Sequence, residues 1–137
     1  MVERMLPEKR SRIMRAIKPK DTKPELAVRQ VLHKEGFRYR LHVRELPGRP
    51  DLVFPKYSSV VEVRGCFWHC HSCMAGRLPA TNSTYWKEKL RRNVARDEEN
   101  MRGLRALGYR VKVVWECELA PDRFARTIEK LVMWIRA

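Results

Sequence analysis

The chain has 137 residues, enough for one hydrophobic core and too few for two ordinary domains, so recognition and chemistry must share a single unit. Thirty Lys and Arg against sixteen Asp and Glu give a formal net charge of +14, and because these charges are spread along the sequence they favour nucleic acid over a membrane surface. No stretch reaches the roughly 20 apolar residues of a membrane span and the charged N-terminus is unlike a signal peptide, so we expect a soluble, cytoplasmic, nucleoid-associated protein.

The first segment, residues 1–21, is basic and has two isolated apolar positions, Met14 and Ile17. We predict that it forms an arm or a short helix outside the core. The remaining residues, 22–137, are expected to form one domain, because no internal repeat or low-complexity segment divides them.

The first helix of this domain is predicted from an N-cap at Thr22 to about Glu35, just before Gly36, with Glu25 as the capping-box acid. Its core stripe should consist of Leu26, Val31 and Leu32. Short runs of β-branched and aromatic residues predict strands, and two further helices complete the chain. The strands are expected at 37–41, 52–54, 60–63 and 110–115, and the helices at 85–107 and 121–136. This order indicates an α/β sandwich around a mixed sheet.

Two carboxylates are expected to face each other across the first hairpin. If the chain turns back through residues 55–58, pairing centred between Lys56 and Tyr57 sets Asp51 opposite Glu62. Alternation supports this register, because it groups four apolar side chains on the core face: Leu52, Phe54, Val61 and Val63. Carboxylates that close would repel each other, and a hard cation such as Mg²⁺ would join them, bridge a scissile phosphate and lower the pKa of an attacking water.

Pro50-Asp51, ten intervening residues and Glu62-Val63-Arg64 resemble the core of PD-(D/E)xK nucleases, with Arg in place of the usual Lys. That resemblance implies a restriction-endonuclease-like three-layer sandwich. The pattern is short, however, and a turn aspartate followed by a solvated Glu62 and Arg64 on an edge strand is the alternative.

A second cluster, GCFWHCHSC at residues 65–73, offers five soft metal ligands, and Cys117 offers a sixth just after the last predicted strand. Disulfides are not expected in a reducing cytosol, so these residues predict a tetrahedral structural zinc site, which needs four ligands. Zinc there would tie the last strand to the loop beside the carboxylates. The spacing leaves open whether Cys70 or His71 is a ligand, and free buried cysteines are the alternative to a site.

Five longer segments carry a more specific resemblance. RSRIMRAIKPKDTKPE, LPGRPDLVF, GCFWHCHSC, ATNSTYWKEKLRRNVARD and LGYRVKVVWEC resemble the very-short-patch repair endonucleases, in the same order and with family-like spacing. These enzymes nick one strand beside a T:G mismatch left when 5-methylcytosine deaminates. The resemblance implies a substrate of double-stranded DNA with a T:G mismatch, a monomeric enzyme, and DNA repair proteins or a cytosine methyltransferase system as companions.

The same resemblance implies roles for individual residues. Asp51 would be the main Mg²⁺ ligand, with Glu25 holding water at the metal. His69 would activate the attacking water or manage its proton, oriented by Asp97. Asp97 also lies on an apolar helical stripe, where a carboxylate needs a partner, and His69 is a natural one. The implied zinc ligands are Cys66, His71, Cys73 and Cys117, with Cys70 a spectator.

Three aromatic residues, Phe67, Trp68 and Trp86, resemble the family's wedge beside the mismatched pair. Their alternative is a place in the core. Met14 and Ile17 similarly resemble the arm that enters the minor groove from the opposite side, which makes residues 1–21 a DNA-contacting arm.

Glu62 and Arg64 depart from the best-known members, which have an apolar residue and a histidine there. Either Glu62 is an added metal ligand and Arg64 contacts phosphate, or the two side chains pair with each other. Two other functions remain in competition: a restriction-like nuclease with a different DNA target, and a zinc-stabilised DNA-binding module without catalysis.

Overall fold

The computed structural model describes residues 22–69, 71, 73 and 81–137. The predicted arm, with Met14 and Ile17, and the predicted spectator Cys70 lie outside the described residues. The helices and strands are, in chain order, α2 (Lys23–Lys34), β1 (Arg40–Leu41), β2 (Leu52–Phe54), β3 (Ser59–Arg64), α3 (Ser83–Ala106), β4 (Arg110–Trp115) and α4 (Phe124–Arg136). Among these described elements, no helix has both the length and the apolar character needed to cross a membrane.

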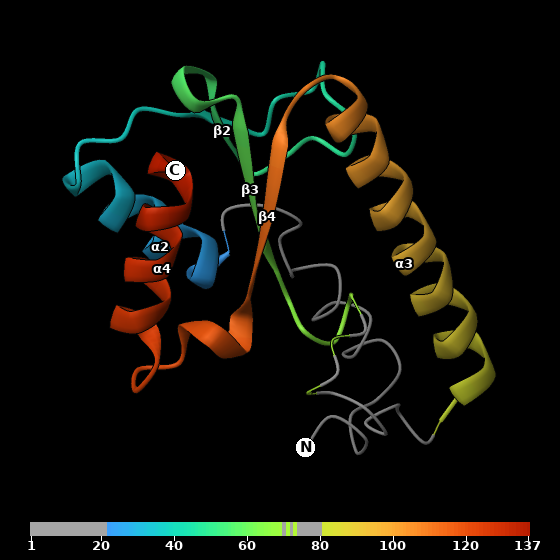
Figure 1. Cartoon of the computed structure of the whole chain (residues 1–137). Coiled ribbons are helices and arrows are strands. Elements are labelled where there is room, and N and C mark those ends of the chain that lie inside the picture. The colour runs from blue at the N-terminus through green and yellow to red at the C-terminus, as the bar shows by residue number, and fades with distance from the viewer. Residues whose placement is uncertain (1–21, 70, 72, 74–80) are drawn as a thin grey trace.

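The four strands form one mixed sheet in the order β1-β2-β3-β4. β1, β2 and β3 pair antiparallel, whereas β3 and β4 run parallel and are joined through α3 (Figure 1). The β2–β3 register pairs Leu52 with Val61 and Phe54 with Ser59, which confirms the predicted hairpin. Because this register is fixed, the residues that flank it, Asp51 and Glu62, are brought to the same end of the hairpin.

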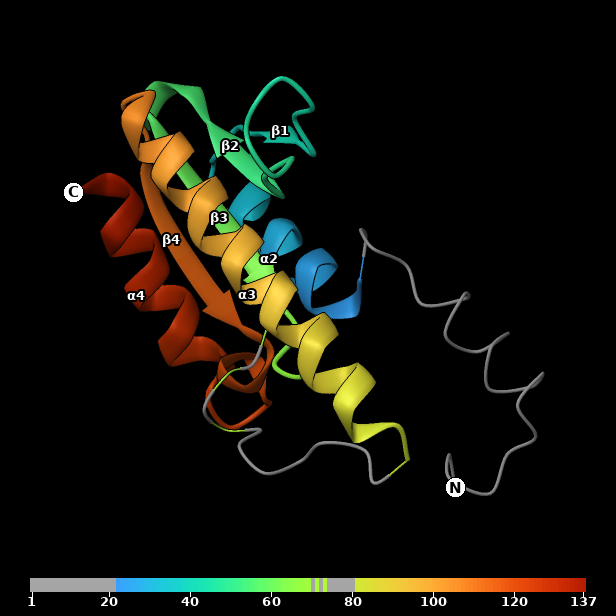
Figure 2. The ribbon, with the colours of Figure 1, turned by 90° about the vertical axis from the view of Figure 1, so that its right-hand side faces the viewer.

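Helices cover both faces of the sheet and make three layers, with α2 and α4 on one face and α3 on the other (Figure 1). Figure 2, the view from the α3 side, shows that helix crossing in front of the strands. One core cluster lies between the sheet and the helices α2 and α4. Its ten buried residues are Val28, Leu32, Phe37, Leu52, Phe54, Val61, Val114, Ile128, Leu131 and Ile135. A smaller cluster on the α3 face consists of Val43, Val53, Val60 and Leu104. The predicted α/β sandwich with a mixed sheet is therefore confirmed.

Two details of the secondary structure differ from expectation. β1 is shorter than the predicted strand 37–41, because the Phe37 N–H donates to the Leu32 carbonyl (3.1 Å) and so ends α2 instead of pairing in the sheet. α4 begins three residues later than predicted, after a turn in which the Phe124 N–H donates to the Ala120 carbonyl (2.8 Å).

The buried stripe of α2 also differs from the predicted Leu26, Val31 and Leu32. Its buried residues are Glu25, Val28 and Leu32, which follow one another at helical spacing. Leu26 and Val31 are half-buried beside this stripe. A charged residue therefore occupies the first position of the buried stripe, and it needs a polar partner there.

Candidate functional site

A pocket of about 380 Å³ collects residues from the connection between β1 and β2, from the end of β3 and the loop after it, and from α3. The residues that line it are His42, Arg44, Gly48, Arg49, Asp51, Glu62, Val63, Arg64, His69, Asp97 and Asn100. Five residues that the sequence singled out lie in this list: Asp51, Glu62, Arg64, His69 and Asp97. The predicted site residues are thus brought together, although they come from positions up to 46 residues apart in the chain (97 − 51).

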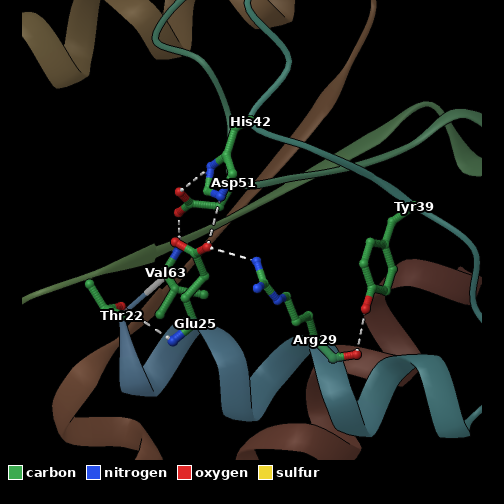
Figure 3. Close-up of polar contacts among 7 residues, drawn as sticks. All are labelled: Thr22, Glu25, Arg29, Tyr39, His42, Asp51 and Val63. Carbon is green, nitrogen blue, oxygen red and sulfur yellow. Dashed lines mark hydrogen bonds and ion pairs between the residues drawn. The ribbon is translucent and has the colours of Figure 1, made fainter. Parts of the chain in front are cut away.

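Asp51 stands immediately before β2, and its Oδ2 accepts a hydrogen bond from the Val63 N–H at 2.8 Å (Figure 3). Burial raises the pKa of the Asp51 carboxyl to about 8, against the opposing effect of the Val63 hydrogen bond. The nearby carboxylates Glu25 and Glu62 raise it further. Near neutral pH this acid therefore keeps its proton unless a cation offsets the charge.

Glu25 reaches the same place from α2. Thr22 caps the helix as predicted, with its Oγ1 accepting from the Glu25 N–H at 3.4 Å, but the Glu25 carboxylate is turned toward His42 and Asp51 (Figure 3). Glu25 is 2 % exposed, and its Oε2 lies 3.1 Å from His42 Nε2 and 3.3 Å from Arg29 Nη1. Its main contacts are therefore those of a buried site residue and not of a capping-box acid alone.

Glu25, His42 and Asp51 form a compact donor group, with one ligand atom from each lying within 4.8 Å of the others. The residues fit a divalent cation. The carboxylates of Glu25 and Asp51 are close enough to repel each other, and the pKa of Asp51 is raised well above that of an ordinary aspartate, so a bound cation would offset both effects. His42 was missed by the sequence analysis. The available signal was its position one residue beyond β1, where continued pairing with β2 brings it opposite Asp51: the His42 N–H donates to the Asp51 carbonyl at 3.2 Å.

His69 lies across the pocket, and its Nδ1 makes a short contact with Asp97 Oδ2. Asp97 comes from α3, and both side chains are half-buried, so the contact predicted from the helical stripe is present. A carboxylate at Nδ1 favours the tautomer with a proton on that nitrogen, which leaves the Nε2 lone pair able to accept a proton. This is the arrangement of an oriented general base.

Glu62 and Arg64 pair with each other, with 2.9 Å between Glu62 Oε2 and Arg64 Nη2. Both side chains are largely buried, at 12 % and 10 % exposed, and the Arg64 guanidinium also lies 5.9 Å from the Trp115 ring centroid. Burial raises the pKa of Glu62, and Arg64 opposes that rise. Of the two alternatives left open by the sequence, mutual pairing is therefore present, and the role of Glu62 as a metal ligand stays a prediction.

A second donor group contains the four predicted zinc ligands, Cys66, His71, Cys73 and Cys117, whose ligand atoms lie within 4.8 Å of one another. His71 Nδ1 is 3.1 Å from Cys73 Sγ and 3.5 Å from Cys117 Sγ. Its ring stacks on Trp115, with the centroids 4.2 Å apart. Burial raises the pKa of the Cys66 thiol to about 12, so this thiol would give up its proton only to a bound cation. This Cys/His group can hold a metal ion, and it joins the loop after β3 to the segment after β4.

The aromatic residues of the predicted wedge pack against one another. Phe67 lies 5.1 Å from Trp68 and 5.6 Å from Trp86 between ring centroids, and the two Trp rings are 5.8 Å apart. All three are half-buried, and none belongs to the two buried core clusters of the described residues. Lys89 Nζ lies 5.8 Å from the Trp68 ring and 5.9 Å from the Trp86 ring. A half-exposed aromatic group beside a cation is suited to stacking on bases near phosphates.

Comparison with known proteins places these features in a family. The family model described as DNA mismatch endonuclease Vsr matches residues 3–75. The chain is 44% identical to the DNA mismatch endonuclease Vsr of Escherichia coli over 110 residues, which covers 80% of this chain and 70% of that protein.

Two type II nicking enzymes are also similar. V.XorIIP of Xanthomonas oryzae is 48% identical over 120 residues, 88% of each chain, and V.NmeAIP of Neisseria meningitidis is 44% identical over 129 residues, 93% of this chain and 92% of that one. These similarities set aside the interpretation of a DNA-binding module without catalysis. The chain belongs to the Vsr family of DNA mismatch endonucleases and is a DNA endonuclease, a hydrolase.

Proposed function

We propose that this endonuclease nicks one strand of duplex DNA next to the thymine of a T:G mismatch that arises from deamination of 5-methylcytosine. The observation that carries the proposal is the pocket that the His69–Asp97 pair lines together with Asp51 and His42, whose side chains form one donor group with the buried Glu25. A nick there would start very short patch repair. The mismatch target is supported by the name of the similar Escherichia coli protein.

In this proposal Asp51 is the main Mg²⁺ ligand and Glu25 holds water at the metal. The bound cation would polarise the scissile phosphate and stabilise its developing charge. His69 accepts the proton of the attacking water at Nε2, and Asp97 holds the imidazole in the tautomer that this transfer requires. The Val63 N–H fixes one oxygen of Asp51 and so leaves the other to face the group at Glu25 and His42.

The pocket is also suited to the charge of its substrate. Arg44, Arg49 and Arg64 line it together with the carboxylates, so a phosphate would enter a site with cations on its walls. Arg64 is already paired with Glu62, and a contact between Arg64 and phosphate would require sharing of its five N–H donors.

Mismatch recognition is assigned to the half-exposed aromatic group. Phe67, Trp68 and Trp86 would stack beside the mismatched pair, where unstacking costs less than in a regular duplex. Met14 and Ile17 of the arm, outside the described residues, would enter the minor groove from the other side. Zinc at Cys66, His71, Cys73 and Cys117 would hold the loop that carries the wedge.

The three layers are taken as a restriction-endonuclease-like fold, with residues 1–21 as a DNA-contacting arm and residues 22–137 as the endonuclease domain. The enzyme would work as a cytoplasmic monomer at the nucleoid, alongside DNA repair proteins or a cytosine methyltransferase.

The test compares nicking of otherwise identical T:G and T:A duplexes with Mg²⁺, with each strand labelled separately. We expect one cut, in the strand that carries the mismatched thymine, and no cut by Asp51→Ala. Asp122→Asn, a change at an exposed acid before α4, is the matched control and should cut normally. Equal cutting of T:G and T:A duplexes, or of neither, would contradict the proposal.

A restriction-like activity on another target is the second candidate, favoured by the likeness to type II nicking enzymes and by Glu62 and Arg64 at positions where restriction-type nucleases carry functional residues. The same assay separates the two functions. A cut in an undamaged site, in one strand or in both, would favour this second candidate.

A further inference from the structure

His42 has been given no chemical role so far, although its ring lies between the carboxylates of Glu25 and Asp51. Figure 3 shows its ring facing Asp51 on one side and Glu25 on the other. Its backbone φ is 47°, in the left-handed region that few residues other than glycine adopt. A non-glycine residue keeps a positive φ only where the surrounding structure holds it there, and such residues are concentrated at functional sites.

The distances around His42 resemble those between ligands of one cation. Nε2 is 3.1 Å from Glu25 Oε2, and one nitrogen of His42 and one carboxylate oxygen from each of Glu25 and Asp51 all lie within 4.8 Å of one another. Around a cation with ligands at about 2.1 Å, neighbouring ligands are about 3 Å apart and opposite ones about 4 Å apart. Nδ1 is 3.9 Å from Asp51 Oδ1, which is too long for a hydrogen bond, and because a cation binds only one nitrogen of an imidazole ring, Nε2 beside Glu25 is the donor. A cation could therefore be held by Asp51, Glu25 and His42 with small side-chain adjustments.

We propose that His42 is a ligand of the divalent cation held at Asp51, which makes the centre a mixed nitrogen and oxygen site. The inference rests on the proposed metal centre. An imidazole nitrogen binds Mn²⁺ or Co²⁺ more readily than Mg²⁺, which prefers oxygen ligands. His42 therefore sets the metal preference of the site and fixes the cation on the Glu25 side of Asp51.

A simpler role is that His42 orients Glu25 through their 3.1 Å contact without touching the cation. In that case the cation would have oxygen ligands from this group, and removal of the imidazole would not change the nuclei around the metal. The two roles are therefore separated by a measurement that detects nitrogen bound to the cation.

The experiment uses the full chain with zinc supplied first and its histidines labelled with ¹⁵N. Mn²⁺ is then added, with and without a T:G duplex, its affinity is measured by calorimetry, and ¹⁵N coupling to the manganese spin is measured by pulsed electron paramagnetic resonance. The variants are His42→Gln, Asp51→Ala and, as the matched control, His33→Gln, which changes an exposed histidine of α2.

We expect ¹⁵N coupling in the wild type and in His33→Gln, and its loss in His42→Gln together with about tenfold or greater weakening of Mn²⁺ affinity. Mg²⁺ affinity should fall by a smaller factor in the same variant. The ligand role is overturned if the wild type shows no ¹⁵N coupling in either state, or if the coupling persists in His42→Gln. If Asp51→Ala leaves Mn²⁺ binding unchanged, the metal centre of the proposed function itself fails.

Discussion

Asp51→Asn should make the protein more stable while it removes activity. The carboxyl of Asp51 has its pKa raised from 3.8 to about 8, so the unfolded chain releases this proton at a lower pH than the folded protein. Between about pH 4 and pH 8 the folded state therefore binds more protons, and its stability falls as the pH rises. Asn can keep the Val63 hydrogen bond through its oxygen while carrying no charge.

The size of this stability difference follows from the raised pKa of Asp51. At about 1.4 kcal/mol for each tenfold change in proton affinity, the full displacement corresponds to on the order of 5 kcal/mol, and the part that develops between pH 5 and pH 8 to on the order of 3 kcal/mol. For a chain of 137 residues this is a difference in Tm of about 10 °C. The gain of Asp51→Asn over the wild type should accordingly increase across this pH range.

The assay is thermal unfolding at several pH values in magnesium-free buffer, with Asp122→Asn as the control for loss of one exposed carboxylate. Adding Mg²⁺ should raise the Tm of the wild type and leave that of Asp51→Asn unchanged, because the cation binds the ionised site. A Tm difference between Asp51→Asn and the wild type that does not vary with pH, or that Asp122→Asn reproduces, would refute the reasoning.

Three further predictions concern the neighbouring groups. Asp97→Asn should lower the single-turnover nicking rate by about 10²–10⁴-fold, because it removes the group that sets the His69 tautomer. The pH–rate profile should change as well, with little change in Tm. An unchanged pH–rate profile would mean that Asp97 has a merely structural role. Cys117→Ser should lose bound zinc and Cys70→Ser should retain it, measured as zinc content per chain; retention by both would contradict the ligand set. Arg64→Met should lower the free energy of unfolding, measured by denaturant titration, by about 3 kcal/mol, because it leaves Glu62 buried without its partner. Adding Glu62→Leu should restore most of the lost stability, and no recovery in the double variant would contradict this account.

The hairpin could be predicted from sequence because two independent constraints agree. Alternation of apolar residues fixes which side chains share a face, and the short turn fixes which residues oppose each other. Asp97 could be predicted for a related reason, since a carboxylate on an apolar helical stripe requires a polar partner, and His69 supplies it. Both inferences depend on periodicity that is local in the chain.

His42 could not be found in this way, because β1 has only two residues and gives almost no alternation to read. Its side chain reaches Glu25 through a backbone with positive φ, which no spacing of residues indicates. The relation between Glu62 and Arg64 stayed open for another reason: residues two apart on a strand lie on the same face whether they bind each other or a phosphate. The start of α4 was misplaced because Pro121 suits a turn as well as a first helical turn.

The parallel pairing of β3 with β4 governs how the protein reaches this state. Ser59 pairs with Arg110, so that contact closes a loop of 51 residues (110 − 59) that contains all of α3. Closing such a loop costs conformational entropy before the strand contacts that offset this cost have formed. The chain should therefore fold more slowly than a helical bundle of the same size. Asp51 and Val63 meet within one hairpin, whereas Cys117 can meet Cys66 only after this closure. The Cys/His group is therefore completed only after this closure, and a metal ion bound there during synthesis would hold the segment after β4 against the loop after β3.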